Sequence, residues 1–137
     1  MKSGEHAAVG AVVGSVAALL LVGTESLPLL AAFVAYGVLL SVFVDLDHFL
    51  LSRVVVGDWR HLRLAVTNPR VGLIEQEKVF AGYDDVLRPR RLLSHHVVGG
   101  VLVFGLVAVG LGGVAVFSAV VLYAHVLCDY LRDLGYA

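Results

Sequence analysis

The sequence predicts an all-α fold, a four-transmembrane-helix bundle made of two helical hairpins joined by a cytoplasmic basic loop. The 137 residues are 59% hydrophobic, and the mean hydropathy of +0.90 exceeds that of typical soluble domains. Long uncharged stretches alternate with turn-forming residues, and most of the positive charge lies in one central segment. We therefore interpret residues 1–137 as a single integral membrane domain.

The first hairpin consists of expected helices over residues 6–23 and 27–50. A helix needs roughly 20 apolar residues to span a bilayer, and each segment contains an apolar run of nearly that length. The intervening GTESLP favours a turn, because Thr24 or Ser26 can cap a helix and Pro28 suits a first helical turn. This segment therefore predicts two antiparallel helices with a short connection.

A signal peptide is the alternative for the first run, since Lys2 precedes it. However, the polar residues Glu5 and His6 stand at the start of the run, and no Ala-x-Ala-like cleavage site follows it. These features favour a helix that is retained.

The second hairpin consists of expected helices over residues 95–111 and 114–133. As one helix, the apolar run 97–124 would be about 42 Å long, which exceeds the hydrocarbon core of about 30 Å. The sequence GLGG at 110–113 supplies the conformations of a turn. Two spans are therefore expected, and a single kinked span is the alternative.

The connecting loop, residues 51–93, contains eight of the ten Lys and Arg residues. The positive-inside rule places this loop in the cytoplasm. With four spans, Lys2 and Arg132 fall on the same side of the membrane. We therefore expect a multi-pass protein of the cell membrane with both termini in the cytoplasm.

Within this loop, DWRHLRLAV is a candidate amphipathic helix. Trp59, Leu62 and Val66 would face lipid, while Arg60 and Arg63 would face the headgroups. A solvated connector with one aromatic anchor is the alternative.

The two hairpins bring histidines and aspartates from all four helices to the cytoplasmic edge. Five of the six histidines belong to this set, and His61 is the exception. Ionisable residues at membrane depth usually pair and usually function. The set comprises His6, Asp45, Asp47, His48, His95, His96, His125 and Asp129.

The depths of these residues agree approximately. We count a rise of 1.5 Å per residue along each helix, starting from the hairpin turn at its other end. On this count His6, Asp45, His95 and Asp129 lie about 22–27 Å from the turn of their own hairpin. His125 comes out deeper, at about 16 Å, and would need the fourth helix to start earlier or to tilt.

The spacing within the helices fits a cation site. Asp45 and His48 are three residues apart, and His125 and Asp129 are four apart, so each pair shares a helix face. Neutral imidazole and carboxylate suit a divalent metal, zinc first and manganese or iron next, while the lone cysteine excludes an all-cysteine site. The expected metal ligands are His6, Asp45, His48, His95, His125 and Asp129.

Asp47 is expected to act differently from Asp45, because residues two apart on a helix diverge by about 200°. It is the candidate catalytic general base, and binding a second metal or orienting a histidine are the alternatives. His95 and His96 diverge in the same way, so only one of them is an expected ligand.

The chain therefore carries a histidine at position 6, DLDH over 45–48, RLLSH over 91–95 and HVLCD over 125–129. In this order the segments resemble the LexA-binding, inner-membrane-associated hydrolase family, and together they span nearly the whole chain. That family is similar to zinc-dependent phospholipase C and P1 nuclease, which are α-helical enzymes that hydrolyse phosphoesters with clustered zinc ions. The resemblance implies a metal-dependent phosphoesterase.

The third segment departs from the family pattern. Arg90 occupies the position of a family histidine and Leu92 that of a glycine. Either His61 or His96 is the candidate replacement for the missing histidine.

The leading functional hypothesis is a membrane-embedded metal-dependent hydrolase that acts on a phosphoester, with a lipid-linked substrate favoured by the location. Arg53, Arg90 and Arg91 flank the helix ends and are expected to bind the phosphate, with a purely topological role as the alternative. A net charge of -1 gives no indication of nucleic acid. The oligomeric state is left open.

The competing hypothesis is a non-catalytic membrane protein whose metal site is structural or sensory and whose basic loop binds a partner. Metal transport is disfavoured, because the outer halves of the helices offer few polar residues.

Overall fold

Helices make up almost all of the chain that the structure describes. The computed structural model describes residues 3–21, 26–73, 79–80 and 82–136, and these ranges contain no strand. In chain order the elements are α1 (Ser3–Leu21), α2 (Leu27–Phe43), the 3-10 turn η1 (Val44–Leu46), α3 (Asp47–Val56), α4 (Arg60–Thr67), α5 (Pro69–Leu73), α7 (Asp84–Ala108) and α8 (Gly112–Asp133).

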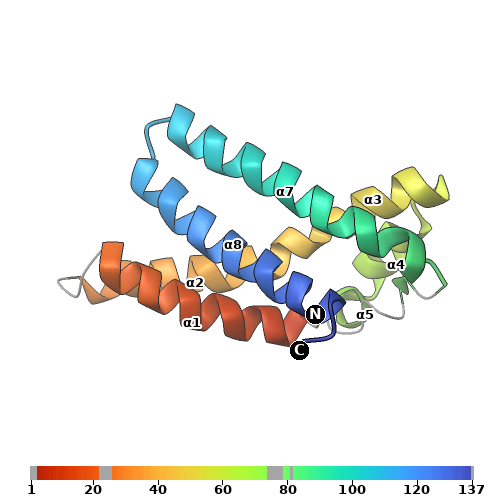
Figure 1. The fold of residues 1–137 in the computed structure, drawn as a ribbon, viewed down its shortest axis with the longest axis horizontal. Coiled ribbons are helices and arrows are strands. Elements are labelled where there is room, and N and C mark those ends of the chain that lie inside the picture. The colour runs from red at the N-terminus through yellow and green to blue at the C-terminus, as the bar shows by residue number, and fades with distance from the viewer. Residues whose placement is uncertain (1–2, 22–25, 74–78, 81, 137) are drawn as a thin grey trace.

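Four helical segments are long and apolar enough to span a membrane, which confirms the predicted fold class. They are Ser3–Leu21, Leu27–Val56, Arg90–Ala108 and Gly112–Asp133. The second has 30 residues. It is therefore about 45 Å long, against a hydrocarbon core of about 30 Å. Its last part, α3, accordingly extends beyond the other spans (Figure 1).

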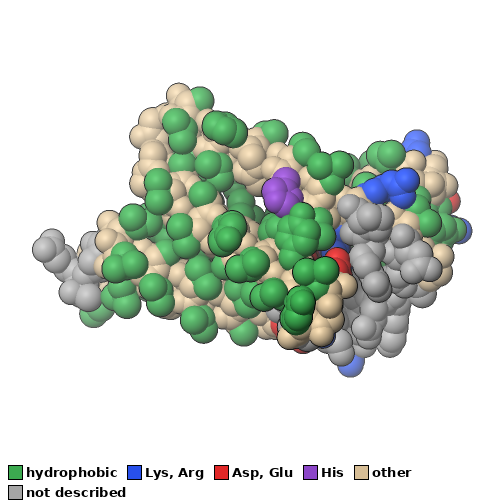
Figure 2. All heavy atoms as spheres, in the orientation of Figure 1, with side chains coloured by type: hydrophobic (Ala, Val, Ile, Leu, Met, Phe, Trp, Pro, Cys, Tyr) green, Lys and Arg blue, Asp and Glu red, His purple; other side chains and the backbone are tan. Residues whose placement is uncertain are grey.

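The outer surface of these helices is apolar. Leu20, Val101 and Phe104 have relative exposures of 82%, 72% and 76%. Figure 2 shows hydrophobic side chains spread over the bundle, with lysine and arginine gathered towards one end. An apolar surface of this extent indicates lipid as the surrounding solvent.

The second hairpin turns at glycine, as predicted. Helix α7 ends at Ala108 and α8 begins at Gly112, while Gly110 between them has a φ of 82°. This backbone conformation favours glycine, because it has no Cβ. The alternative of one kinked span is therefore wrong.

The first hairpin is described only on its two sides. Residues 22–25, which include Thr24, lie outside the described residues. Ser26 occupies the position before α2 without a capping bond from its side chain, and Pro28 lies in the first turn.

Small residues let α1 and α2 pack at close range. A Cβ on Gly10 would lie 2.7 Å from both the Gly37 carbonyl oxygen and Ser41 Cβ, and Gly14 also faces Gly37. Close backbone approach through glycines spaced four apart is a known means of helix association in lipid. This contact holds the start of α1 beside the end of α2, where the polar residues lie.

Both termini and the connecting segment lie at one end of the bundle, which we call the loop end (Figure 1). The expected loop 51–93 is largely helical there, since α3 continues to Val56, α4 and α5 follow, and α7 begins already at Asp84. The physical reason is a local apolar core in which Phe49, Phe80 and Leu87 are buried together. A hydropathy profile does not show that residues as far apart in the sequence as Phe49 and Leu87 pack together.

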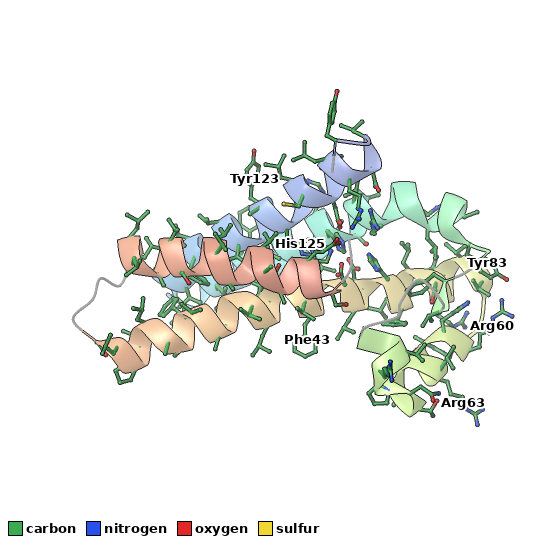
Figure 3. The ribbon with its side chains drawn as sticks, turned by 90° about the horizontal axis from the view of Figure 1, so that it is seen from below. Phe43, Arg60, Arg63, Tyr83, Tyr123 and His125 are labelled. Atoms are coloured by element: carbon green, nitrogen blue, oxygen red, sulfur yellow. The ribbon has the colours of Figure 1, made fainter. Side chains whose placement is uncertain are left out.

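The candidate amphipathic segment forms α4. Trp59 and Val66 have relative exposures of 49% and 70%, as expected of a lipid-facing side. Leu62 instead packs against the loop-end core. Arg60 and Arg63 point away from the bundle (Figure 3).

A second apolar core fills the opposite half of the bundle. Ala17, Ala18, Phe117 and Val121 are buried there. Except for the exposed His96, the histidines and aspartates of the set predicted above lie between this core and the core at the loop end.

Candidate metal centre

Five elements deliver polar side chains to one buried cluster, which we call the His/Asp cluster. The 3-10 turn η1 interrupts the long second span at this point, and a 3-10 turn aligns residues three apart more closely than an α-helix does. Figure 3 shows His125 among nitrogen- and oxygen-bearing side chains where the spans meet. The cluster comprises His6 (α1), Asp45 (η1), Asp47 and His48 (α3), His95 (α7), and His125 and Asp129 (α8).

The cluster contains two groups that could hold a metal ion, and Asp45 belongs to both. The first group is His6, Asp45, His125 and Asp129, and the second is Asp45, His48 and His95. Within each group the ligand atoms lie within 4.8 Å of one another. All six residues expected as ligands therefore fall in these two groups.

The spacing inside the cluster matches metal ligands better than hydrogen bonds. The histidine Nε2 atoms lie 3.3–3.8 Å from oxygens of Asp45 and Asp129. An N–H···O hydrogen bond is shorter, about 2.7–3.2 Å. Two ligands that are each about 2.1 Å from a tetrahedral zinc ion lie roughly 3.4 Å apart.

The Nε2 atoms of four histidines share a further property. In His6, His48, His95 and His125 this atom is buried and has no hydrogen-bond partner among the described residues. A buried polar atom left without a partner is costly. Cations held by the two ligand groups would satisfy all four.

Charge balance also favours a cation. Asp45, Asp47 and Asp129 have relative exposures of 2%, 6% and 0%. Burying carboxylates is costly unless positive charge accompanies them. Arg91 supplies one such charge, with its Nε 3.8 Å from Asp129 Oδ2. A divalent ion would balance the others.

Two side chains orient the histidines. His95 Nδ1 donates a hydrogen bond of 2.8 Å to Asp47 Oδ2, which turns the opposite ring nitrogen toward Asp45. Ser41 Oγ lies 3.4 Å from His125 Nδ1 and is fully buried. Carboxylate and hydroxyl partners of this kind fix the orientation of metal-binding imidazoles.

Asp45 and Asp47 therefore approach the His95 ring from different sides, as their divergence on the helix predicts.

The sequence prediction did not include Ser41. Its signal was available, because it is the one serine of the uncharged run 27–44 and lies one helical turn before Asp45.

His125 reaches the cluster despite its greater depth along the helix. Helix α8 begins at Gly112, two residues earlier than expected, which adds about 3 Å to its reach. The His125 ring also stacks on His6, with centroids 3.9 Å apart.

The arginines expected to bind phosphate are separated by the structure. Arg91 Nη2 donates to both carboxylate oxygens of Asp133, at 2.9 and 3.0 Å. Arg90 donates to the Val86 carbonyl, and Arg53 donates to the Gly57 carbonyl at the end of α3. Among the three, Arg91 is the arginine beside the cluster.

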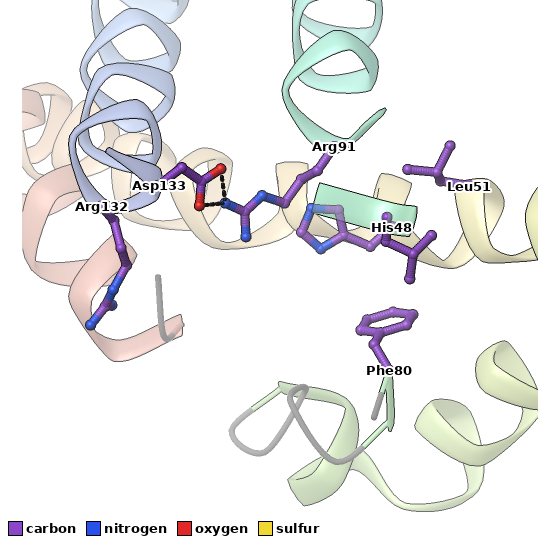
Figure 4. A pocket seen from close by; sticks show the side chains of 7 residues that line it. His48, Leu51, Phe80, Arg91, Arg132 and Asp133 are labelled. Carbon is purple, nitrogen blue, oxygen red and sulfur yellow. Dashed lines mark hydrogen bonds and ion pairs between the residues drawn. The ribbon is translucent and has the colours of Figure 1, made fainter. Parts of the chain in front are cut away.

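A cavity of about 270 Å³ opens beside the cluster, and we call it the loop-end cavity. His48, Arg91 and Arg132 contribute nitrogen atoms to its wall, Asp133 contributes a carboxylate that is paired with Arg91, and Leu51 and Phe80 contribute apolar surface (Figure 4). Arg132 also pairs with Glu5 of α1. Sequence reasoning did not assign Arg132 to the site.

Neither alternative histidine belongs to the two ligand groups. His96 is exposed and lies near Tyr130, with ring centroids 6.2 Å apart. His61 lies at the loop-end core between Phe80 and Tyr83. Burial, and then the positive charge of Arg60, lower the pKa of His61 below its ordinary value of 6.5.

No family model matches the chain, and no curated protein or solved structure matches it.

Proposed function

We propose that this chain is a membrane-embedded metal-dependent hydrolase whose His/Asp cluster opens to the cytoplasm and acts on a phosphoester. The observation that carries the proposal is the convergence on Asp45 of four Nε2 atoms, from different helices, that have no hydrogen-bond partner within the described part of the chain. A cavity with two arginines in its wall lies directly beside this point.

Imidazole and carboxylate donors suit zinc best in this proposal, with manganese or iron as alternatives. The six residues of the two ligand groups would hold the metal. A divalent cation supplies Lewis acidity and activates water for attack on phosphorus. The group that contains His48 borders the loop-end cavity and is therefore the one that a substrate can approach.

The protein side chains would bind the substrate and move the proton. Arg91 and Arg132 would bind the anionic oxygens of the phosphoester in the loop-end cavity. Hydrolysis joins a water oxygen to phosphorus, breaks the P–O bond to the leaving alcohol and transfers a proton to that alcohol's oxygen. Asp47 Oδ1, 3.7 Å from His48 Nε2, would accept the proton from the attacking water.

The orientation in the membrane follows from charge in this proposal. Most of the lysine and arginine residues belong to the segment at the loop end. The positive-inside rule places that end, with both termini, in the cytoplasm.

A structural metal site in a non-catalytic protein is the second candidate function, and one observation favours it. The group of His6, Asp45, His125 and Asp129 is almost fully buried, with relative exposures of 0–2%. Structural metal sites are typically closed in this way. In such a protein the basic loop would bind a partner.

Turnover measurements separate the two functions. The purified full-length chain is assayed with soluble phosphomonoesters and phosphodiesters, with zinc or manganese present or with a chelator. The hydrolase proposal predicts metal-dependent turnover that is lost in Asp45→Asn. A metal-loaded protein without turnover would favour the structural role.

Arg91→Gln and Arg90→Gln form a matched pair for the substrate site. Removing the Arg91 charge should lower kcat/KM several-fold, while the neighbouring Arg90, which bonds to Val86 O, should be dispensable. Equal effects of the two variants would contradict the assignment of Arg91 to phosphate binding.

A further inference from the structure

A second hollow lies on the side of the bundle that faces lipid, between α7 and α8, and we call it the α7–α8 groove. Its volume is about 450 Å³. Gly99 and Gly100 on α7 and Ala119 on α8 leave the space, because they carry little or no side chain. Leu122 and Val126 of α8 also line it and are themselves buried.

The groove ends on the His/Asp cluster. His95 lines its loop-end side and also presents Nε2 to Asp45 Oδ1 at 3.3 Å. His48, whose ring centroid lies 5.0 Å from that of His95, lines the loop-end cavity instead. The groove and the cavity thus meet the cluster at two adjacent histidines.

The polarity along the groove matches that of a lipid. His95, His96 and Tyr130 line the end near the loop end, whereas Val103 and Phe104 line the part deeper in the bundle. Tyrosine and histidine rings carry polar atoms that suit the membrane interface, and purely apolar side chains such as those of valine and phenylalanine suit the hydrocarbon.

The length of the groove also matches one lipid leaflet. Phe104 is nine positions after His95 on α7, a distance of about 13.5 Å along the helix. Half of a hydrocarbon core of about 30 Å is roughly 15 Å. A chain lying in the groove would therefore come from the leaflet at the loop end.

We propose that the α7–α8 groove holds one acyl chain of a phospholipid from the surrounding leaflet and presents its phosphoester to the His/Asp cluster. The headgroup would lie toward the loop-end cavity, where Arg91 and Arg132 complement its negative charge. Presentation for hydrolysis rests on the proposed function, whereas occupancy of the groove does not. Because the bilayer is as apolar as the groove, the groove positions the lipid rather than binding it tightly.

Gly100 offers a direct test with a matched control. A Cβ at Gly100 meets nothing within 4 Å, so a larger side chain enters the groove without striking the backbone. A Cβ at Gly105 on the same helix also meets nothing within 4 Å. Gly100→Phe should therefore block the groove, and Gly105→Phe should leave it open.

The experiment uses the full-length chain in bilayers that contain phosphatidylglycerol with a photoactivatable diazirine in one acyl chain. After irradiation, mass spectrometry measures adducts at the groove residues Leu122 and Val126 relative to the exposed Val101. We expect groove adducts in wild type, a several-fold lower ratio in Gly100→Phe and no change in Gly105→Phe. Gly100→Leu replaces the phenylalanine variant if that variant fails to insert.

An unchanged ratio in the Gly100 variant would overturn the groove proposal. Adducts found only at Val101, or a groove covered by a second copy of the chain in crosslinked dimers, would overturn it as well.

Turnover of a long-chain phospholipid and of a soluble phosphodiester then separates the two proposals. Gly100→Phe should lower turnover of the long-chain substrate several-fold and leave the soluble one unchanged. Groove labelling without any hydrolysis by wild type would end the hydrolase proposal alone. Hydrolysis of both substrates that Gly100→Phe leaves unchanged would end the groove proposal alone.

Discussion

Asp45 connects the two halves of the candidate metal centre. Its Oδ2 faces His6 at 3.4 Å, and its Oδ1 faces His95 at 3.3 Å and His125 at 3.4 Å. A carboxylate with this many imidazole neighbours can bridge the two ligand groups. Asp47 has a different position, because its Oδ2 accepts from the far side of the His95 ring.

Metal affinity should therefore fall to different extents in two isosteric variants. Asp45→Asn removes an oxygen ligand shared by both groups and should abolish stoichiometric binding. Asp47→Asn disturbs only the orientation of His95 and should weaken binding roughly 10- to 100-fold. Competition with a chromophoric chelator measures both affinities, and Asp58→Asn at an exposed position serves as control. Equal losses would show that Asp47 is itself a ligand.

His61 should make the loop-end core sensitive to acid. Its pKa in the folded chain lies below 6.5, chiefly because of burial. As the pH falls below about 6.5, the unfolded state takes up a proton before the folded state does, so stability decreases in that window. Above it the residue is neutral in both states.

Thermal unfolding monitored by the fluorescence of Trp59, the single tryptophan, measures this effect. The unfolding midpoint of wild type should drop between pH 7 and pH 5 more than that of His61→Phe. Parallel curves for the two proteins would exclude His61 as the cause.

At the residue scale, the sequence predicts which side chains share a helix face but not how faces from different helices meet. The pairs Asp45/His48 and His125/Asp129 follow from spacing alone. The bond from His95 to Asp47 depends on how α7 is rotated against α3. The same rotation brings Arg91, and not Arg90, beside α8.

At the element scale, the contact between α1 and α2 positions His6. Gly10 and Gly37 allow the two backbones to approach closely, because a Cβ on Gly10 would lie 2.7 Å from Gly37 O and a Cβ on Gly37 would lie 3.3 Å from Gly10 O. His6 lies one helical turn before Gly10, and Asp45 lies two turns after Gly37. The geometry of this ligand pair thus depends on the small residues beside it.

Gly10→Ala should consequently weaken both the fold and the metal site. The new Cβ would lie 2.7 Å from Gly37 O, and overpacking of this kind costs about 1–3 kcal/mol. Gly4→Ala makes the same chemical change on the same helix, and its Cβ meets nothing within 4 Å. Thermal stability and metal affinity should fall only in the Gly10 variant. Matching values for the two variants would contradict this account.

The spans themselves are predictable, because hydropathy sums over about 20 residues and single exceptions matter little. Helix boundaries at the loop end are not. Helix α7 starts at Asp84 because Leu87 packs against Phe49 and Phe80, and such burial depends on residues far apart in the chain.

At the scale of the whole molecule, paired hairpins place all of the cluster at one depth. Tyr36 and Ser118 in the opposite half are hydrogen-bonded to each other at 2.8 Å. Together with the buried Phe117, this pair packs the interior between the cluster and the far side of the bundle.

Labelling with a membrane-impermeant thiol reagent tests the orientation of the bundle in the membrane. Single cysteines at Arg70 and at Gly112, in a Cys128→Ala background, mark the loop end and the second hairpin turn. Position 70 should react from the cytoplasmic side and position 112 only from the other side. Labelling of position 112 from the cytoplasm would contradict the paired-hairpin topology.

The most direct test of the central claim is the metal content of the full-length chain purified in detergent, combined with X-ray absorption spectroscopy of the bound ion. We predict a stoichiometric divalent metal coordinated by imidazole nitrogen and carboxylate oxygen, and its loss in Asp45→Asn. A folded wild-type chain that stays free of metal after exposure to zinc, manganese and iron would contradict it.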